Sequence, residues 1–457
     1  MNERVGAGVS SGAVRWILIV GLGIGVVYTL SPLTVLTALA AVVLVRWAGA
    51  GSADGERRWV YALLMTAIAL RALALAALFA TTNHAHTPFG FFFPDEELFV
   101  RRSIWMRNIA LAIPVHSADF IYVYDEAGAT SYLYPLALAH LLLGPSPYGV
   151  HLLSAVLYLA GCVVLFRLVR PAFGAQAAGL GFAALLFLPS LFLWSISVLK
   201  EPMFFMLMAL GAALTVRIAR TRSWLLLAGG VAVLIALVFV EQSIREGGLV
   251  MVGGGLGTGL LLAWLVQRPR LLVAMAIVGA VAAPIVLTRG TVQDRVVHSL
   301  REAAKLNWGH VNSRGYVYTT LSPRIYEDRD TANTMTLHEG ARYVANSFVS
   351  YVAVPAPWQI QSRSALVFWP EQAMWYALVA LVPVGLFVGL RRSPDLACVL
   401  AAAAATAIAA VALTSGNIGT LVRHRGLALP YLVWFSVLGW CTVLVHLSDR
   451  TRDHADH

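Results

Sequence analysis

Three consecutive acidic side chains, Asp95, Glu96 and Glu97, follow three phenylalanines in a chain in which only 12% of residues are charged. Carboxylates at the edge of an apolar segment are costly unless they have solvent, a partner or a chemical task. Pro94 before them is typical of a helix start, where acids complement the helix dipole and Glu97 can pair with Arg101. The alternative is general-base chemistry, in which a carboxylate takes a proton from a hydroxyl group. Asp95 is the first candidate for that base, and Glu96 is the second.

Two other polar clusters could bind an anion. Lys200 and Glu201 end an apolar segment, in a chain with only two lysines and 31 arginines. Lys200 can hold a phosphate as a point charge, or the two residues can neutralise each other. Arg423, His424 and Arg425 lie at the edge of another apolar segment. Arginines there can stabilise charge that develops on a lipid phosphate, or can extend toward lipid headgroups.

Two long polar stretches, 81–148 and 288–372, interrupt the apolar pattern. In the first, tyrosines that include Tyr132 are mixed with acids. This composition suits sugar binding, although tyrosines also form the interfacial belt of membrane proteins. The second holds His338 and Arg342 in a helix-like sequence that lacks the second histidine of a zinc motif. We predict a structural helix on the membrane there, with both side chains as candidate substrate contacts.

These residues must be positioned by apolar segments. The chain has 457 residues, of which 59% are hydrophobic, and a mean hydropathy of +0.74. Such a composition excludes a soluble globular protein and predicts an all-α polytopic membrane protein. Three cysteines, all in apolar runs, argue against a disulfide framework and a zinc site. The apolar segments fall near 16–30, 32–45, 58–80, 149–166, 174–197, 202–216, 224–240, 247–266, 271–287, 373–390, 395–414 and 427–447.

We therefore expect about twelve membrane segments, with juxtamembrane helices in the two long polar stretches. The first two segments are short and form either two tilted spans or a re-entrant hairpin. The expected organisation is an N-terminal membrane hairpin (1–57), a transmembrane core with the first loop (58–287), a large second loop (288–372), and C-terminal transmembrane segments with a short tail (373–457).

The placement of arginine predicts the orientation of these segments. One set of short loops carries 16 basic residues, and the alternate short loops carry four. The positive-inside rule then places both termini in the cytoplasm and both long stretches on the extracytoplasmic face. A net charge of +10 is explained by these loops, and we expect no nucleic-acid partner. The candidate residues all fall on the outer face.

Together these residues resemble the GT-C superfamily of membrane glycosyltransferases, especially bacterial relatives of the protein O-mannosyltransferase and aminoarabinose transferase group. In that group the first outer loop opens with Asp-Glu, here Asp95-Glu96, and juxtamembrane helices follow. The stretches 132–174 and 187–202 are also similar to the group, as are GNIGTLVRHR (416–425) and VPAPWQ (354–359). The resemblance implies a polyprenyl-phosphate-linked sugar donor, a first-loop acid as base, and a glycan, lipid or protein acceptor, in contact with membrane lipids and without a cofactor.

Two alternatives stay open. The layout also resembles O-antigen ligases and polymerases, in which arginine and histidine of the late loop would carry the reaction. A flippase or transporter for lipid-linked sugars would move the carrier without forming a product. A transporter needs access from both faces. The polar residues of this chain instead fall on one side, and Arg71 is the one charged residue deep in a predicted span. Arg71 must face the interior of the helix bundle or a cavity.

Overall fold

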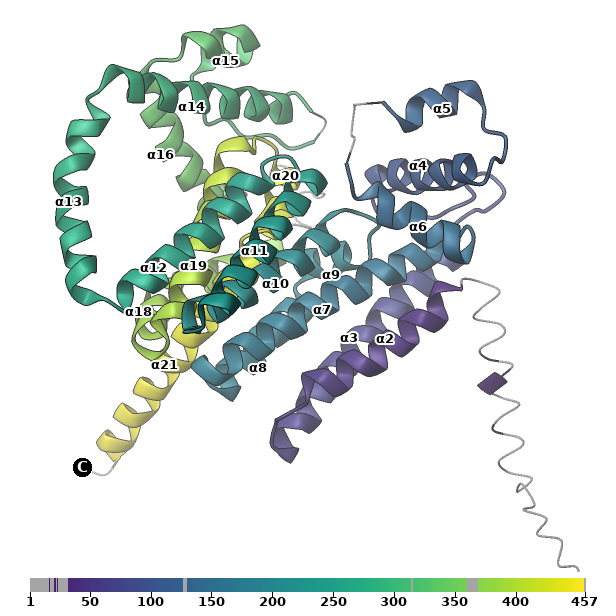
Figure 1. Ribbon diagram of the computed structural model, residues 1–457, viewed down its shortest axis with the longest axis horizontal. Helices are drawn as coiled ribbons and strands as arrows, with labels where there is room; N and C mark the ends of the chain where they lie inside the picture. Colours follow the sequence, from purple (N-terminus) through teal and green to yellow (C-terminus); the bar gives the residue numbers. More distant parts are fainter. Residues whose placement is uncertain are drawn as a thin grey trace, which may run out of the picture. The chain divides into compact units, whose positions relative to one another are not determined.

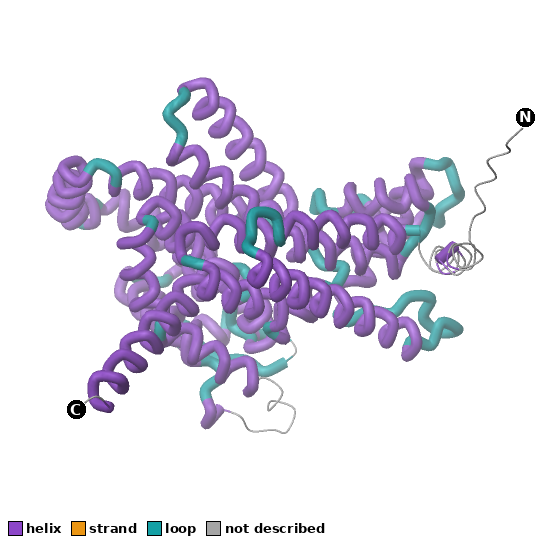
Figure 2. Tube along the Cα trace, turned by 90° about the horizontal axis from the view of Figure 1, so that it is seen from below, coloured by secondary structure: helices purple, strands orange, loops and turns teal. Residues whose placement is uncertain are grey.

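The computed structural model describes residues 32–125, 130–313, 315–359 and 369–455, together with Trp16, Val20, Gly21 and Gly23. Over these residues the chain is helical, with one isolated β-bridge between Val317 and Asn417 and no strand (Figure 2). The prediction of an all-α protein is confirmed for the described part of the chain.

The helices have the following bounds, labelled as in Figure 1: α2 (Leu33–Ala48), α3 (Asp54–Thr81), α4 (Pro94–Ala110), α5 (Ser117–Val123), α6 (Leu133–Leu143), α7 (Pro147–Phe173), α8 (Ala175–Phe187), α9 (Pro189–Ser195), α10 (Glu201–Arg220), α11 (Trp224–Ile244), η1 (Leu249–Gly254), α12 (Gly255–Val266), α13 (Pro269–Leu287), α14 (Gly290–Val311), α15 (Pro323–Glu327), η2 (Arg329–Thr334), α16 (Leu337–Ala353), η3 (Pro357–Gln359), α17 (Trp369–Ala380), α18 (Val382–Arg392), α19 (Pro394–Thr414), α20 (Ile418–Arg425) and α21 (Leu429–Ala455).

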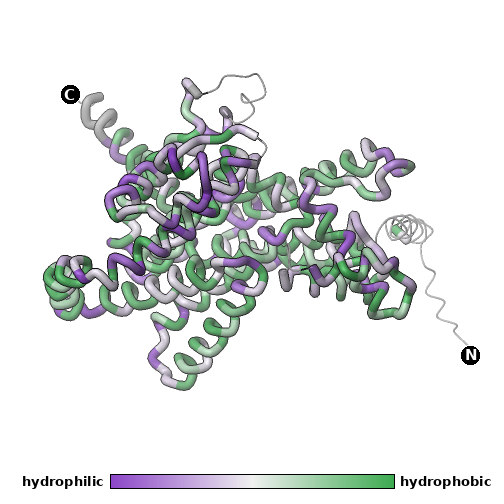
Figure 3. The backbone as a smooth tube through the Cα atoms, turned by 90° about the horizontal axis from the view of Figure 1, so that it is seen from above, coloured by the Kyte–Doolittle hydropathy of each residue, from purple (hydrophilic) through white to green (hydrophobic). Residues whose placement is uncertain are grey.

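Eight helices of the described chain are long and apolar enough to cross a membrane, and two bent helix pairs raise the number to ten. The chain is therefore a polytopic helical membrane protein. Hydrophobic residues dominate the long helices, and hydrophilic residues are concentrated in the connecting segments (Figure 3). The expected segment 16–30 lies almost wholly outside the described residues, and 32–45 forms α2, which is 16 residues long. The count of twelve stays a prediction.

Prolines divide two of the expected segments. The segment expected at 174–197 forms α8 and α9, which meet at Pro189 with a bend of 62°. The segment expected at 373–390 lies in α17 and α18, which are bent by 45° just before Pro383. Proline lacks the N–H that continues a helix and clashes with the preceding turn, so each segment breaks at its proline.

The chain forms two compact units, and the first comprises Met1–Ala160 with Leu193–Met203. In this unit α2 packs on α3, and α4 packs on α5 and α6. Between α3 and α7, the described residues form the helices α4, α5 and α6, and the 11 residues of the apolar α6 are too few to span a membrane. Within this unit, Ser195, Ile196 and Val198 form hydrogen bonds with side chains of α3, α7 and α4, respectively.

The second unit comprises Gly161–Phe192 with Phe204–His457. Its α12 lies close against α19 because two glycines remove the side chains that would separate them. A Cβ atom at Gly259 would lie 2.8 Å from the Val399 Cα atom, and one at Gly255 would lie 3.1 Å from the Ala403 Cα atom. Within the run GGGLGTG (253–259), these two glycines therefore serve close helix packing.

The described residues of the stretch 288–359 form a helical layer on the end of α19 within the second unit. Its apolar core is made of α14, α15, η2 and α16: Leu300, Ala304, Leu321, Ile325, Ala332, Met335 and Tyr343. Hydrogen bonds tie this layer to the chain after α19, because Asn307 Nδ2 and the Tyr318 hydroxyl both donate to the Ser415 carbonyl. Ahead of the layer, α13 contacts α12 and α14 and holds no buried residue (Figure 1).

Candidate functional site

The three acids that open α4 have three different environments. Asp95 is exposed, whereas Glu96 is fully buried. Glu97 forms an ion pair with Arg101 one turn along, so this predicted pairing is confirmed. Of the three carboxylates, Asp95 is the exposed one, and it lies in the first turn of α4.

Glu96 joins α4 to a segment more than a hundred residues away in the sequence. Its Oε1 atom accepts hydrogen bonds from the Phe92 and Phe93 amides at 3.0 and 2.7 Å. Its Oε2 atom accepts from the Val198 amide at 2.8 Å, and Val198 is fully buried. Charged acceptors make the stronger hydrogen bonds of proteins. Glu96 therefore serves as an internal acceptor that fixes the start of α4 against residues 195–200.

His151 and Tyr132 complete the surroundings of Glu96. The Nδ1 atom of His151 lies 2.7 Å from the Ile196 carbonyl and 3.4 Å from Glu96 Oε2. A carbonyl only accepts, so Nδ1 carries the proton. Burial raises the pKa of Tyr132, whose hydroxyl interacts with Ser154 and with the charges of Glu201 and Glu96.

Three of the predicted residues, Glu96, Tyr132 and Glu201, thus come together in the first unit. His151 was missed by the sequence analysis. The signal that could have found it is a lone histidine inside an apolar segment, where an ionisable group needs a polar partner.

Arg71 contacts the first residue of the segment 195–200, whose Val198 amide binds Glu96. It is 1% exposed, and its Nε atom donates to the Ser195 hydroxyl at 2.8 Å. Its Nη1 atom donates to the Ala67 carbonyl at 3.1 Å, and its guanidinium lies 5.5 Å from the centre of the Tyr158 ring. The expectation that Arg71 faces the interior is confirmed. Residues 195–198 are thus held from both sides, and the partly exposed Lys200 follows them directly.

In the second unit, Arg425 is an internal anchor. It is 4% exposed, and it donates to the Tyr351 and Val354 carbonyls and, at 2.7 Å, to Gln372 Oε1. Its guanidinium also lies 4.7 Å from the centre of the Trp375 ring. Burial lowers the pKa of Arg425 to about 10. The predicted contact of this arginine with a phosphate has to compete with these internal acceptors.

Arg423 and His424 are partly exposed on α20. The Nε2 atom of His424 lies 2.9 Å from Arg245 Nη2, and because arginine only donates, this histidine nitrogen accepts. Sequence analysis missed this role of Arg245, which caps α11. Nearby in the sequence, Glu241 is fully buried, and neither carboxylate oxygen has a hydrogen-bond partner among the described residues.

His338 and Arg342 are exposed on α16, one helical turn apart. The predicted helix is confirmed, and a capping box between Thr336 and Glu339 begins it. Glu339 also accepts from Arg324, at 2.7 Å from Nη2, and this hydrogen bond lowers the pKa of Glu339 to about 2. The acid of the HEGAR sequence is therefore engaged in holding the start of α16.

The predicted residues divide between the two units. The first unit contains Asp95, Glu96, Tyr132, Lys200 and Glu201, and the second contains His338, Arg342, Arg423, His424 and Arg425. Among the described residues, no three His, Cys, Asp or Glu side chains form a group that could hold a metal ion. No protein-family model matches this chain, and no curated protein matches it.

Proposed function

We propose that the chain is a glycosyltransferase that moves a sugar from a polyprenyl-phosphate-linked donor to an acceptor on the extracytoplasmic face of the cell membrane. The arginine-rich short loops support this orientation, with both termini in the cytoplasm. The acidic helix start, the Lys200 segment and the arginines of α20 then share the outer face. Donor and acceptor would meet there.

The observation that carries the proposal is the hydrogen bond between Glu96 Oε2 and the Val198 amide. Asp95 directly precedes the anchored carboxylate, and Lys200 follows the anchored amide by two residues. An exposed acid and a scarce lysine thus belong to two segments that are fastened together. Catalysis requires such groups to be held in place, because misplacement of about 1 Å can cost 10²-fold in rate.

In the proposed reaction, the Asp95 carboxylate takes the proton of the acceptor hydroxyl. The hydroxyl oxygen attacks the anomeric carbon of the sugar as the bond from that carbon to the phosphate oxygen breaks. The phosphate leaves on its lipid with the electron pair, and the anomeric configuration inverts. A general base of this kind contributes about 10²–10⁴-fold to the rate.

The departing phosphate needs a positive partner because negative charge develops on it in the transition state. Lys200 is the candidate in the first unit, and Arg423 with His424 are the candidates in the second. Arg425 is assigned a supporting role, because its guanidinium already donates hydrogen bonds to the Tyr351 and Val354 carbonyls. Glu201 and Tyr132 are buried, and they are proposed to support the sugar site from beneath Lys200.

The test compares Asp95→Asn with Glu97→Gln in proteoliposomes supplied with a panel of polyprenyl-phosphate sugars. Release of polyprenyl phosphate is the readout. Asp95→Asn should lower turnover by about 10²–10⁴-fold. Glu97→Gln removes a neighbouring carboxylate from an exposed ion pair and should leave turnover within about twofold. Wild-type turnover in Asp95→Asn would exclude Asp95 as the base.

A ligase- or polymerase-like enzyme is the second candidate, because His338 and Arg342 are both exposed on one side of α16. In that case His338→Ala or Arg342→Ala abolishes product formation, whereas Asp95→Asn is tolerated. The same panel of variants therefore separates the two proposals.

A further inference from the structure

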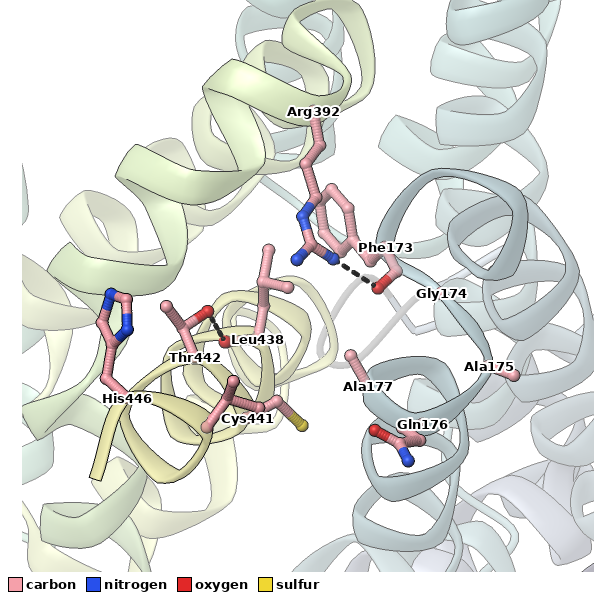
Figure 4. A pocket seen from close by; sticks show the side chains of 11 residues that line it. Phe173, Gly174, Ala175, Gln176, Ala177, Arg392, Leu438, Cys441, Thr442 and His446 are labelled. Carbon is pink, nitrogen blue, oxygen red and sulfur yellow. Dashed lines mark hydrogen bonds between the residues drawn. The ribbon is translucent and has the colours of Figure 1, made fainter. Parts of the chain in front are cut away.

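The second unit contains a cavity of about 500 Å³ at the junction of α7 and α8 with the end of α18 and the middle of α21 (Figure 4). None of the residues discussed above as candidates for catalysis is among its lining residues. Its lining residues are Phe173, Gly174, Ala175, Gln176, Ala177, Arg392, Leu438, Cys441, Thr442, Val445 and His446. A volume of this size is typical of sites for small molecules.

The cavity arises where closely packed helices end. A Cβ atom at Gly385 of α18 would overlap the Phe435 carbonyl of α21, so the two backbones are in direct contact there. Farther along, α18 stops at Arg392 while α21 continues, and Gly174 turns the chain from α7 into α8 with a φ of +91°. This left-handed backbone conformation favours glycine. The helices therefore leave a space that their side chains do not fill.

The cavity has an apolar floor and a polar rim. Its floor is made of buried apolar residues, which include Phe173, Ala177 and Leu438. Its rim carries the exposed side chains of Gln176, Arg392 and His446. Figure 4 shows these three side chains around the opening, from three different helices. The combination fits a ligand with one polar and one hydrocarbon end.

The positive charge at the rim favours an anionic ligand. The Nη1 atom of Arg392 donates to the Phe173 carbonyl at 3.1 Å, which holds the guanidinium at the mouth of the cavity. None of the described residues that line the cavity carries a carboxylate. A guanidinium with donors in a planar fork is well suited to a phosphate group.

We propose that this cavity binds the phosphate headgroup of an anionic phospholipid. Arg392 would hold the phosphate with help from His446 and Gln176, and an acyl chain would lie along Leu438 and Val445. In the proposed topology these helix ends face the cytoplasm, where the leaflet is rich in anionic lipids, and basic pockets between helices on that side bind such headgroups. The site is independent of glycosyl transfer.

The test measures how much phosphatidylglycerol the full-length protein retains, by native mass spectrometry after extraction from phosphatidylcholine bilayers with and without phosphatidylglycerol. Arg392→Gln should lower the retention by about fivefold, as expected for the loss of one arginine beside an anionic headgroup. The control is Arg391→Gln. Arg391 is the exposed neighbour that lies over the Phe387 ring and does not line the cavity. Equal losses in the two variants would indicate general surface charge and would overturn the proposal.

A second pair of variants avoids any effect of the Arg392 hydrogen bond on folding. His446→Glu places a carboxylate on the rim, and Ser448→Glu places one on the same helix outside the lining. Only His446→Glu should abolish retention. Inorganic phosphate should compete weakly, because it lacks the hydrocarbon end that the floor accommodates. Full displacement by inorganic phosphate would assign the site to free phosphate and exclude a lipid.

Discussion

Replacing Glu96 by glutamine tests whether its buried carboxylate positions the proposed base. An amide keeps one oxygen, but it puts an N–H₂ group in the place of the other, so the variant cannot accept from both sides. If the oxygen stays toward Phe92 and Phe93, the buried Val198 amide loses its acceptor. A lost charge-assisted hydrogen bond together with an orphaned buried N–H costs about 2–4 kcal/mol. At about 2–4 °C per kcal/mol for a unit of 150–250 residues, the melting temperature should fall by roughly 5–15 °C.

The same variant should lower kcat more than it raises KM, because its defect lies in placement and not in donor binding. We expect about a 10²-fold loss of kcat from a shift of about 1 Å at the start of α4. Thermal unfolding in detergent and turnover in proteoliposomes measure the two effects, with Glu97→Gln as the control for charge. Unchanged melting would refute the assigned hydrogen bond to Val198. Lower melting with full turnover would refute the positioning role.

Three further predictions concern packing, the two arginines of α20 and pH. Gly259→Ala should destabilise the protein by about 1–3 kcal/mol in thermal unfolding, because the new Cβ atom would press on the backbone of α19. The control is Gly257→Ala, whose Cβ atom would meet nothing within 4 Å, so this variant should be neutral or stabilising. Arg425→Gln should lower the free energy of unfolding by about 3–5 kcal/mol because it leaves buried carbonyls unsatisfied, and Arg423→Gln should lower it by less than about 1 kcal/mol. Equal losses of stability in thermal unfolding would contradict the anchor role of Arg425. Burial lowers the pKa of His140 to about 4, below its unfolded value of about 6.5, so its stabilising effect is full above pH 6.5 and is lost as the pH falls to about 4. His140→Gln should flatten this part of the stability profile, and an unchanged profile would show that His140 does not titrate as described.

The helical class and the positions of most long helices could be predicted from apolar segments alone, because hydrocarbon thickness sets a minimum length for each span. Breaks inside those segments were harder to predict. Pro189 and Pro383 bend their segments, although prolines are tolerated in many membrane helices when neighbours satisfy the freed groups. Sequence analysis expects helices in the stretch 81–148 but gives no bounds for them, because an apolar helix of 11 residues such as α6 is too short for a span.

The site was predicted only at the level of residue type. Sequence could point to Asp95 and Glu96 together, but it could not tell which carboxylate is exposed, because both belong to the same helical turn. That difference depends on the Val198 amide, which is 102 residues away from Glu96. Arg423 and Arg425 pose the same problem, since the acceptors of Arg425 come from Tyr351 and other residues distant in the sequence. Spacing reports which side chains share a surface, and tertiary contacts decide what each one does.

The absence of buried residues from α13 has a consequence for how its sequence can change. Its 19 residues measure about 28 Å at 1.5 Å per residue, close to the hydrocarbon thickness of about 30 Å. A helix that buries nothing against its own chain is constrained by its length and its hydropathy, not by the shape of individual side chains. Most exchanges among alanine, valine, leucine and isoleucine in α13 should therefore be neutral, whereas a deletion of one turn should displace the helical layer that begins at α14. A saturation mutagenesis map would show α13 as the most permissive span of the second unit toward apolar residues, and among the least permissive toward changes in length.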